Sequence, residues 1–298
     1  MTPRAITAAI AMLSIAASVV SGCGIQADAQ SWLTVRDERT VSRTLRFGGG
    51  GSDRVVDLRT IHGSIRVTAA DRPDVQLDAR RTVRARSQAD VERAEREVTL
   101  EVLDDASRVG AVVRDPASTV CGEPWNDRRS WRRQDYVVEY EFAAQVPRRT
   151  NLRLCTVNGG QVDVDGIEGE FDISNVNGGI TIRSARGTGN AETVNGLIVA
   201  TFLESPKSEM RLKTLNGNVD ATFPAALSAD VLLKTFNGNL WTDFDVQYLP
   251  RQVQTADRRS GRFSYKSDGS ARVRIGNGGP TIAIETFNGD VRVLKAAR

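Results

Sequence analysis

Thr193-Val194-Asn195-Gly196 is one of six copies of a short sequence motif, here called the phrase, from which the fold of this chain is predicted. The first five copies recur every 18 to 21 residues, and the sixth lies close to the last residue. A fixed period in this range is typical of stacked repeats and not of an ordinary globular core. The copies are Thr156-Val157-Asn158-Gly159, Asn175-Val176-Asn177-Gly178, Thr193-Val194-Asn195-Gly196, Thr214-Leu215-Asn216-Gly217, Thr235-Phe236-Asn237-Gly238 and Thr286-Phe287-Asn288-Gly289.

The spacing of apolar residues around each Asn-Gly pair indicates how the chain continues beyond it. Asn-Gly is a strong signal for a tight hairpin, so an antiparallel β-sandwich or meander is one candidate fold. However, the residue before the Asn is always apolar, and the third residue after it is apolar in five of the six copies. These two positions have the same parity along an extended chain and predict one inward face. We therefore expect an all-β, single-stranded β-solenoid with coils of about 20 residues that stack in parallel; the antiparallel sandwich or meander is the alternative.

The repeated Asn and Gly residues are predicted to be structural. Gly accepts corner conformations that a Cβ atom disfavours, and stacked Asn amides can hydrogen-bond from coil to coil. The Thr of each phrase is expected to stack outward. The predicted turn residues are Asn158, Gly159, Asn177, Gly178, Asn195, Gly196, Asn216, Gly217, Asn237, Gly238, Asn288 and Gly289.

The first residues read as the signal peptide of a bacterial lipoprotein. A positive charge is followed by an apolar stretch and then by Val20-Ser21-Gly22-Cys23, which resembles a lipobox. We expect cleavage after residue 22 and attachment of lipid to Cys23. No other apolar run approaches the ~20 residues of a membrane span, so the lipid is predicted to hold the protein at the membrane.

Three segments follow from this interpretation. Residues 1–22 are the signal peptide, 23–50 a lipid-anchored tether, and 51–298 the repeat domain. A helix is expected in the first of three insertions, because Ser87 is followed by an acidic residue at the capping position and by a charged stretch. The insertions lie near residues 86–97, 115–134 and 249–272.

Cysteine usage agrees with an oxidising compartment outside the cytoplasm. The chain has three cysteines, and two remain if Cys23 carries lipid. A disulfide between Cys121 and Cys155 is the hypothesis, with two separate buried thiols as the alternative.

The sequence largely lacks the residue combinations that common enzymes and metal proteins use. His62 is the single histidine, and it stands at a degenerate copy of the repeat, so we interpret it as structural. We expect no catalytic residue, no metal site and no cofactor. Paired carboxylates of a carbohydrate-active β-helix enzyme are the alternative, with Asp163, Asp165 and Asp172 as candidates. The net charge of +3 does not indicate a nucleic-acid partner.

One predicted loop combines aromatic rings with cations. Such a surface can contact sugars, anionic polymers or phospholipid headgroups. Packing of the rings onto the repeat body is the other interpretation. The possible ligand surface consists of Trp125, Arg128, Arg129 and Trp131.

The lipobox, the short helical insertion and the repeats that end in Glu285-Thr286-Phe287-Asn288-Gly289-Asp290-Val291 resemble a bacterial family of putative adhesins, a domain of unknown function with β-strand repeats. The resemblance covers residues 50 to 298. It implies a β-solenoid at the cell envelope and brings no catalytic motif.

These observations predict a membrane-anchored lipoprotein that faces the periplasm or the exterior. Its expected role is non-enzymatic, as an adhesin-like binder or a scaffold, with a polysaccharide, cell-surface or protein ligand. Two other functions stay open: the carbohydrate-active lyase or hydrolase, and an envelope-sensing component that binds a protein partner.

Overall fold

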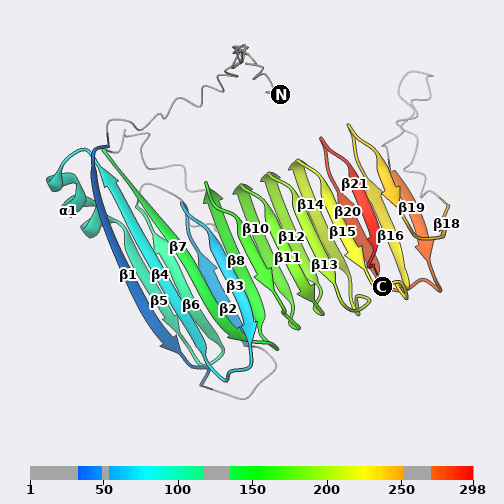
Figure 1. Cartoon of the computed structure of the whole chain (residues 1–298), viewed down its shortest axis with the longest axis horizontal. Coiled ribbons are helices and arrows are strands. Elements are labelled where there is room, and N and C mark those ends of the chain that lie inside the picture. Colours follow the sequence, from blue (N-terminus) through cyan, green and yellow to red (C-terminus); the bar gives the residue numbers. More distant parts are fainter. Residues whose placement is uncertain (1–32, 49–53, 117–134, 251–269, 298) are drawn as a thin grey trace, which may run out of the picture. The chain divides into compact units, whose positions relative to one another are not determined.

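The computed structural model describes residues 33–48, 54–116, 135–250 and 270–297. The chain divides into two compact units, Met1–Trp32 and Leu33–Arg298, and the described residues all belong to the second. Those residues are nearly all β, with one helix and two large mixed sheets (Figure 1). The prediction of an all-β chain with one short helical insertion is confirmed.

The two sheets, here called sheet A and sheet B, hold ten and eleven strands. In spatial order, sheet A consists of β1 (Val35–Leu45), β4 (Val75–Ala85), β7 (Tyr136–Pro147), β3 (Ile65–Ala70), β9 (Val162–Asp165), β11 (Ile180–Ala185), β13 (Ile198–Phe202), β15 (Val219–Phe223), β21 (Val291–Lys295) and β17 (Leu240–Thr242). Sheet B consists of β18 (Val246–Tyr248), β19 (Ser270–Ile275), β16 (Ala229–Lys234), β20 (Thr281–Glu285), β14 (Met210–Asn216), β12 (Gly189–Asn195), β10 (Phe171–Asn177), β8 (Asn151–Asn158), β2 (Val55–Arg59), β6 (Arg108–Arg114) and β5 (Thr99–Asp104).

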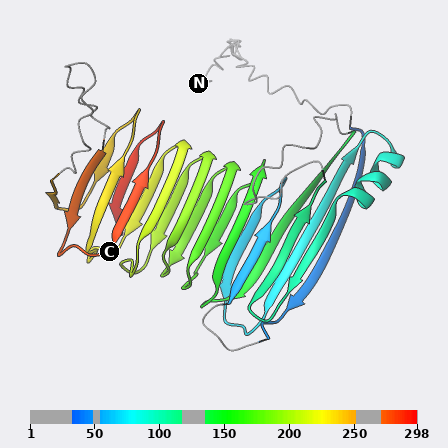
Figure 2. The same cartoon turned by 180° about the vertical axis from the view of Figure 1, so that it is seen from behind.

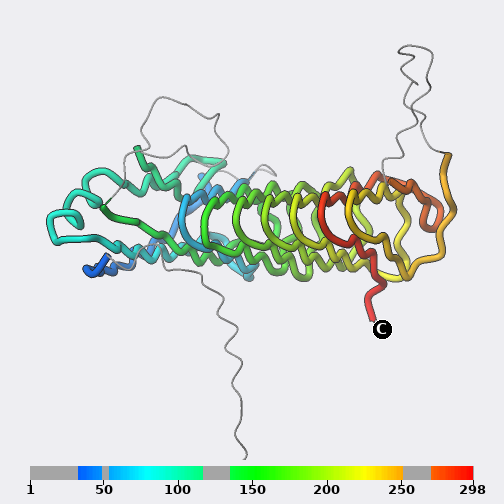
Figure 3. The backbone as a smooth tube through the Cα atoms, turned by 90° about the horizontal axis from the view of Figure 1, so that it is seen from above, coloured from blue at the N-terminus to red at the C-terminus, as the bar shows by residue number. Residues whose placement is uncertain are grey.

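Across the repeats, consecutive strands alternate between the two sheets. The chain passes from β8 in sheet B to β9 in sheet A, then to β10 in sheet B, and so on, and Figure 3 shows these passes as successive coils. Equivalent strands of neighbouring coils pair in parallel, with Asn177 opposite Asn158 and Asn195 opposite Asn216. Antiparallel pairs join β1, β4 and β7, as well as β5 to β6 and both β16 and β18 to β19. Both sheets are therefore mixed.

The core lies between the two sheets and follows the period-two pattern of the strands. Ile180 and Ile182 of β11 are fully buried, as are Ile198 and Ala200 of β13. The inward position three residues after each Asn is therefore predicted correctly for these coils. Aromatic rings also stack across coils, since the centroids of Phe202 and the next coil's Phe223 are 5.0 Å apart.

The last coil in the sequence is not the last coil in space. Strand β20 lies between β14 and β16, and β21 lies between β15 and β17 (Figure 1). The sixth copy of the phrase therefore sits between the fourth and the fifth. The chain reaches this place after β19, which pairs antiparallel with β16.

The end of the sheets formed by β1 and β5 differs from the prediction. Residues 23–50 are predicted to be a tether, but β1 pairs with β4 along all of its 11 residues. Val35 and Val41 are half-buried, and most other residues of β1 are polar. The strand therefore has no strong apolar periodicity, and for this reason it was not predicted from the sequence.

The predicted helix is present as α1 (Gln88–Glu97), visible beside β1 in Figure 2. The Ser87 side chain accepts a hydrogen bond from the Asp90 backbone N–H, as a capping residue does. Val91 and Ala94 are buried, and the Tyr136 hydroxyl of β7 donates a hydrogen bond to Glu97. Of the other two predicted insertions, most residues lie outside the described part, but Ser270–Ile275 is strand β19 and so belongs to sheet B.

Candidate functional site

The repeated phrase forms a row of corners where the chain leaves sheet B for sheet A. At each corner the Thr is buried, and its hydroxyl donates a hydrogen bond of 2.8–2.9 Å to a Gly carbonyl of the neighbouring coil. Asn175 stands in the same place in the second copy and donates through its amide at 2.9 Å. The donor–acceptor pairs are Thr156–Gly63, Asn175–Gly160, Thr193–Gly178, Thr214–Gly196, Thr286–Gly217 and Thr235–Gly289.

The predicted orientation of this phrase was wrong at two positions. Thr was expected to point outward and the following apolar residue inward, whereas Thr193 is buried and Val194 is 37% exposed. The reason is parity on the sheet B side: Ala191 and Thr193 share the inward face of β12, so Val194 faces out. The residues four before each Asn are apolar in every copy, and counting back to them would have found the correct face.

The outward Asn side chains form a continuous ladder of amides. Each amide after that of Asn158 donates to the Oδ1 atom of the Asn before it in the stack, at 2.7–2.9 Å. The interior amides therefore use one N–H and one lone pair in the ladder and keep one of each. In spatial order the ladder consists of Asn158, Asn177, Asn195, Asn216, Asn288 and Asn237.

Glycine allows the corners to approach one another closely. Gly217 has φ +151°, and a Cβ atom there would lie 2.1 Å from the carbonyl oxygen of Gly196. A larger residue at this corner would therefore separate the coils and break the amide ladder.

An exposed apolar column runs beside the ladder. Its exposure rises along the stack from 37% at Val194 to 44% at Leu215 and Phe287 and 69% at Phe236. The rings of Phe287 and Phe236 stack with centroids 4.7 Å apart and planes 5° from parallel. We call this column and the Asn ladder together the repeat ridge; the column consists of the half-buried Val157 and Val176 and the exposed Val194, Leu215, Phe287 and Phe236.

The repeat ridge carries no charged side chain. The acidic Asp290 follows the last ladder residue in the sequence, but its Oδ1 accepts the Asn239 N–H at 2.9 Å and its Oδ2 lies 3.3 Å from Arg292. The hydrogen bond from the Asn239 backbone lowers the pKa of Asp290 below its ordinary value. The neutral surface of hydrocarbon and amide groups is therefore bordered by Asp290, which already has partners, and by the register row Glu192, Lys213, Glu285 and Lys234, in which the signs of charge alternate.

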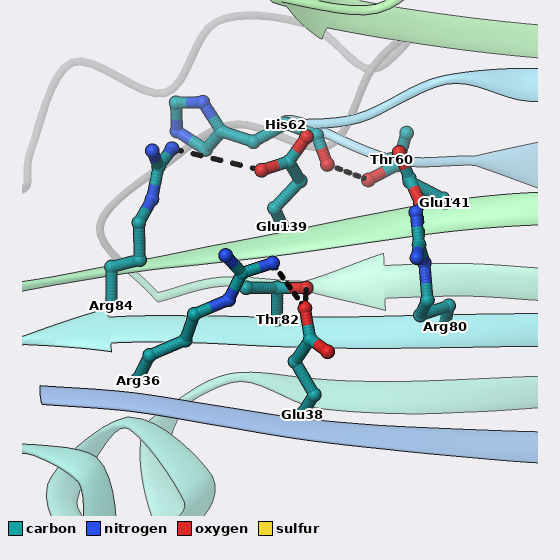
Figure 4. A network of polar contacts seen from close by, with 9 residues as sticks. All are labelled: Arg36, Glu38, Thr60, His62, Arg80, Thr82, Arg84, Glu139 and Glu141. Atoms are coloured by element: carbon teal, nitrogen blue, oxygen red, sulfur yellow. Dashed lines mark hydrogen bonds and ion pairs between the residues drawn. The ribbon is translucent and has the colours of Figure 1, made fainter.

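The amide ladder ends at Asn158, and beyond it the backbone of His62 forms a parallel β-bridge with Asn158. Burial lowers the pKa of His62, opposed by Asp115 and Glu139, whereas Arg84 lowers it further. Figure 4 shows the surrounding face of β1, β4 and β7, where Arg84 pairs with Glu139 at 3.6 Å and Arg80 pairs with Glu141. The hydroxyl of Thr60 donates to the His62 carbonyl at 2.9 Å. His62 thus replaces an Asn in the fold and belongs to a face of paired charges.

Of the three candidate catalytic carboxylates, Asp163 and Asp165 lie on the same face of one strand, and Asp172 is separate from them. Asp163 and Asp165 belong to β9 in sheet A, whereas Asp172 belongs to β10 in sheet B. Asp163 lies 3.7 Å from Arg183 and 3.9 Å from Arg66. Asp172 lines a surface depression of about 480 Å³. The structure therefore gives these three side chains no shared site.

Within residues 33–48, 54–116, 135–250 and 270–297, no group of three or more His, Cys, Asp or Glu side chains is arranged to hold a metal ion. Among the same residues, no helix is long and apolar enough to cross a membrane.

Several predicted residues lie outside the described part of the chain. Cys155 is buried in β8 beside Arg59 of β2, but its predicted partner Cys121 is not described, so the disulfide stays a prediction. The lipid attachment residue Cys23 also falls outside. The same holds for the predicted ligand surface of Trp125, Arg128, Arg129 and Trp131.

Comparison with known proteins found similarity in structure only. No protein-family model and no curated protein matches the sequence. A putative cell adhesion protein from Clostridium sporogenes is similar at 9% identity and a TM-score of 0.35, over 87% of this chain and 100% of that protein. Putative adhesins from Bacteroides fragilis (9% identity, TM-score 0.26, covering 87% of this chain and 97% of that one) and Parabacteroides merdae (10%, 0.23, 88% and 97%) are also similar. At these TM-scores the likenesses carry no functional argument.

Proposed function

We propose that this chain is a lipid-anchored β-solenoid protein of the cell envelope that binds its ligand along the repeat ridge and catalyses no reaction. The observation that carries the proposal is the exposed apolar column beside the Asn ladder. Soluble proteins rarely expose a continuous row of apolar side chains unless that row binds a partner.

The rigidity of the ridge supports a binding role. The Asn amides are held by one another, and the column stands on corners that are fixed by the Thr hydroxyls. A surface whose side chains are ordered before binding loses little conformational entropy when a ligand arrives. A long row of equivalent groups also suits an extended ligand.

The anchor and the covalent bridge are parts of the same proposal. Lipid on Cys23 would hold the protein at the membrane, facing the periplasm or the exterior. A Cys121–Cys155 disulfide would tie the segment after β6 to strand β8. The Trp125 and Trp131 surface is a second place where this protein would meet a ligand. Because Asp172 lies in another sheet than Asp163 and Asp165, no site that joins all three candidate carboxylates supports the enzyme alternative, and no contact described above favours the sensing alternative.

Binding of purified protein to isolated bacterial cell-envelope fragments tests the ridge. The double variant Leu215→Ala/Phe236→Ala removes exposed apolar area from the column and is expected to reduce the bound fraction severalfold. Leu203→Ala is the matched control, because Leu203 is 45% exposed, close to the 44% of Leu215, but follows directly after the last residue of β13, away from the corners. Equal binding by the double variant, the control and the wild type would refute the ridge as the binding surface.

Acylation is tested separately in cells. Cys23→Ser is expected to release the protein from the membrane fraction, whereas Cys121→Ser is expected to leave it there. A Cys23→Ser protein that still sediments with membranes would contradict the lipid anchor.

A further inference from the structure

We infer that the ligand of the repeat ridge is a neutral, linear glycan that lies along the stack with about one sugar unit per coil. This inference rests on the proposed function, because it names the chemical class that the same surface would take. Its basis is the pairing of two columns with different chemistry at one regular spacing.

The Asn column supplies the polar half of a sugar site. Asn177, Asn195, Asn216 and Asn288 each donate to one ladder neighbour and accept from another. Each interior amide therefore keeps one N–H donor and one lone pair. Sugar hydroxyls both donate and accept hydrogen bonds, so an amide with one free group of each kind can satisfy a hydroxyl on either side. The ladder holds every amide in the same orientation.

The apolar column supplies the other half. One face of a pyranose ring presents C–H groups, and such a face packs against hydrocarbon or an aromatic ring. The side chains of Val194 and Leu215 are exposed hydrocarbon, and Phe287 and Phe236 continue the row. Phe287 covers one face of the Phe236 ring, while 69% of Phe236 stays exposed. This exposed area leaves room for contact with one sugar unit.

The spacing of the columns suits a linear polymer of sugar units. Parallel strands lie about 4.8 Å apart, and this distance is close to the length of one pyranose unit in an extended glycan. Each coil would then offer one amide and one apolar contact to each sugar. Affinity would come from the repetition of weak contacts along the chain.

Two other polymer classes fit less well. Anionic polymers are bound through Lys and Arg. The ridge has neither, and in the row beside it Lys213 and Lys234 alternate with Glu192 and Glu285 at paired register positions, so that row has no excess of positive charge. A peptide strand adds to a free sheet edge through backbone hydrogen bonds. At the corners these groups are already used, with Gly178 N–H bonded to Asn195 at 3.0 Å and Gly217 N–H bonded to Asn288 at 2.9 Å. A neutral glycan needs no such backbone groups.

The test is isothermal titration of the full chain, purified with its native N-terminus, with neutral β-linked glucose and N-acetylglucosamine oligomers of two to eight units. An anionic polygalacturonate series of the same lengths is titrated in parallel. We expect the neutral series to bind with an affinity that rises with length and levels off near six units, the number of amides in the ladder. Phe236→Ala should weaken binding about tenfold, equal to ~1.4 kcal/mol, and Leu203→Ala should leave it unchanged.

Three results would overturn the inference. They are no binding of either neutral series, binding of the anionic series alone, and neutral binding that Phe236→Ala does not change. A different result would refute the proposed function: equal binding of envelope fragments by the wild type and the ridge variants. Envelope binding that depends on Leu215 and Phe236, without glycan binding, would refute the glycan and keep the ridge.

Discussion

Asn175→Thr is expected to stabilise the protein, although it removes a buried hydrogen-bonding group. Asn175 takes the place of the buried Thr in the second copy of the phrase, and its amide donates to the Gly160 carbonyl at 2.9 Å and to the Gly179 carbonyl at 3.2 Å. Its Oδ1 atom is buried and has no partner. In the other five copies a Thr hydroxyl makes the bond between coils and leaves no such acceptor.

The magnitude follows from the groups that change. An unpaired buried polar group costs ~1–3 kcal/mol, and the lost second bond to Gly179 is worth ~0.5–1.5 kcal/mol. The bond to Gly160 would be kept by the Thr hydroxyl. The difference predicts a gain of about 1 kcal/mol in the free energy of unfolding, equal to a rise of roughly 2–4 °C in Tm for a protein of this size.

Urea unfolding followed by circular dichroism measures the change. The matched control is Thr193→Asn in the next coil, which creates the same unpaired acceptor and should lose about 1 kcal/mol. A loss of stability in Asn175→Thr, together with no change in Thr193→Asn, would refute the reasoning that the orphan Oδ1 atom is costly.

Three further changes test the ladder, the histidine and the order of the coils. Asn216→Ala interrupts the amide ladder between Asn195 and Asn288 and should cost ~1 kcal/mol in the same assay; an unchanged midpoint would argue against a stabilising ladder. Burial lowers the pKa of His62, so its contribution to stability is complete above the unfolded-state pKa of about 6.5 and falls as the pH drops below that value. His62→Asn should remove this pH dependence between pH 7.5 and 5, and an identical acid loss in both proteins would contradict it. Deletion of residues 280–298 removes Ile282, Ile284, Val291 and Val293, all 0% exposed. The loss of their burial should lower the free energy of unfolding by ~1.5–3 kcal/mol for each side chain. A truncated protein that still unfolds cooperatively at the wild-type urea concentration would contradict the internal position of this coil.

The regular part of the fold could be predicted from local patterns. Each Asn-Gly pair marks a corner, and the apolar residues that follow it mark the inward face of the sheet A strand. The helix was predictable because Ser87 is a local capping signal. These features depend on residues that are close together in the sequence, where turn geometry and side-chain alternation act directly.

The candidate site was harder to predict because it depends on which side chains of each corner point toward solvent. The apolar residue of each phrase looks like a core residue, and only the parity of the preceding strand shows that it is exposed. Strand β1 was missed because its side chains are mainly polar and its pairing partner, β4, lies about 40 residues away in the sequence. Edge strands with charged side chains carry little apolar signal.

The sequence by itself determined that this chain is built from repeated corners, with Asn, Gly and an apolar residue at each of them. The tertiary structure was needed to show that Val194, Leu215, Phe287 and Phe236 form one continuous exposed column and that the sixth coil lies between the fourth and the fifth. The reason is that the coils present nearly identical edges, so local sequence scarcely distinguishes one neighbour from another. Their order is settled by contacts between strands far apart in the chain, such as β14 with β20 and β20 with β16.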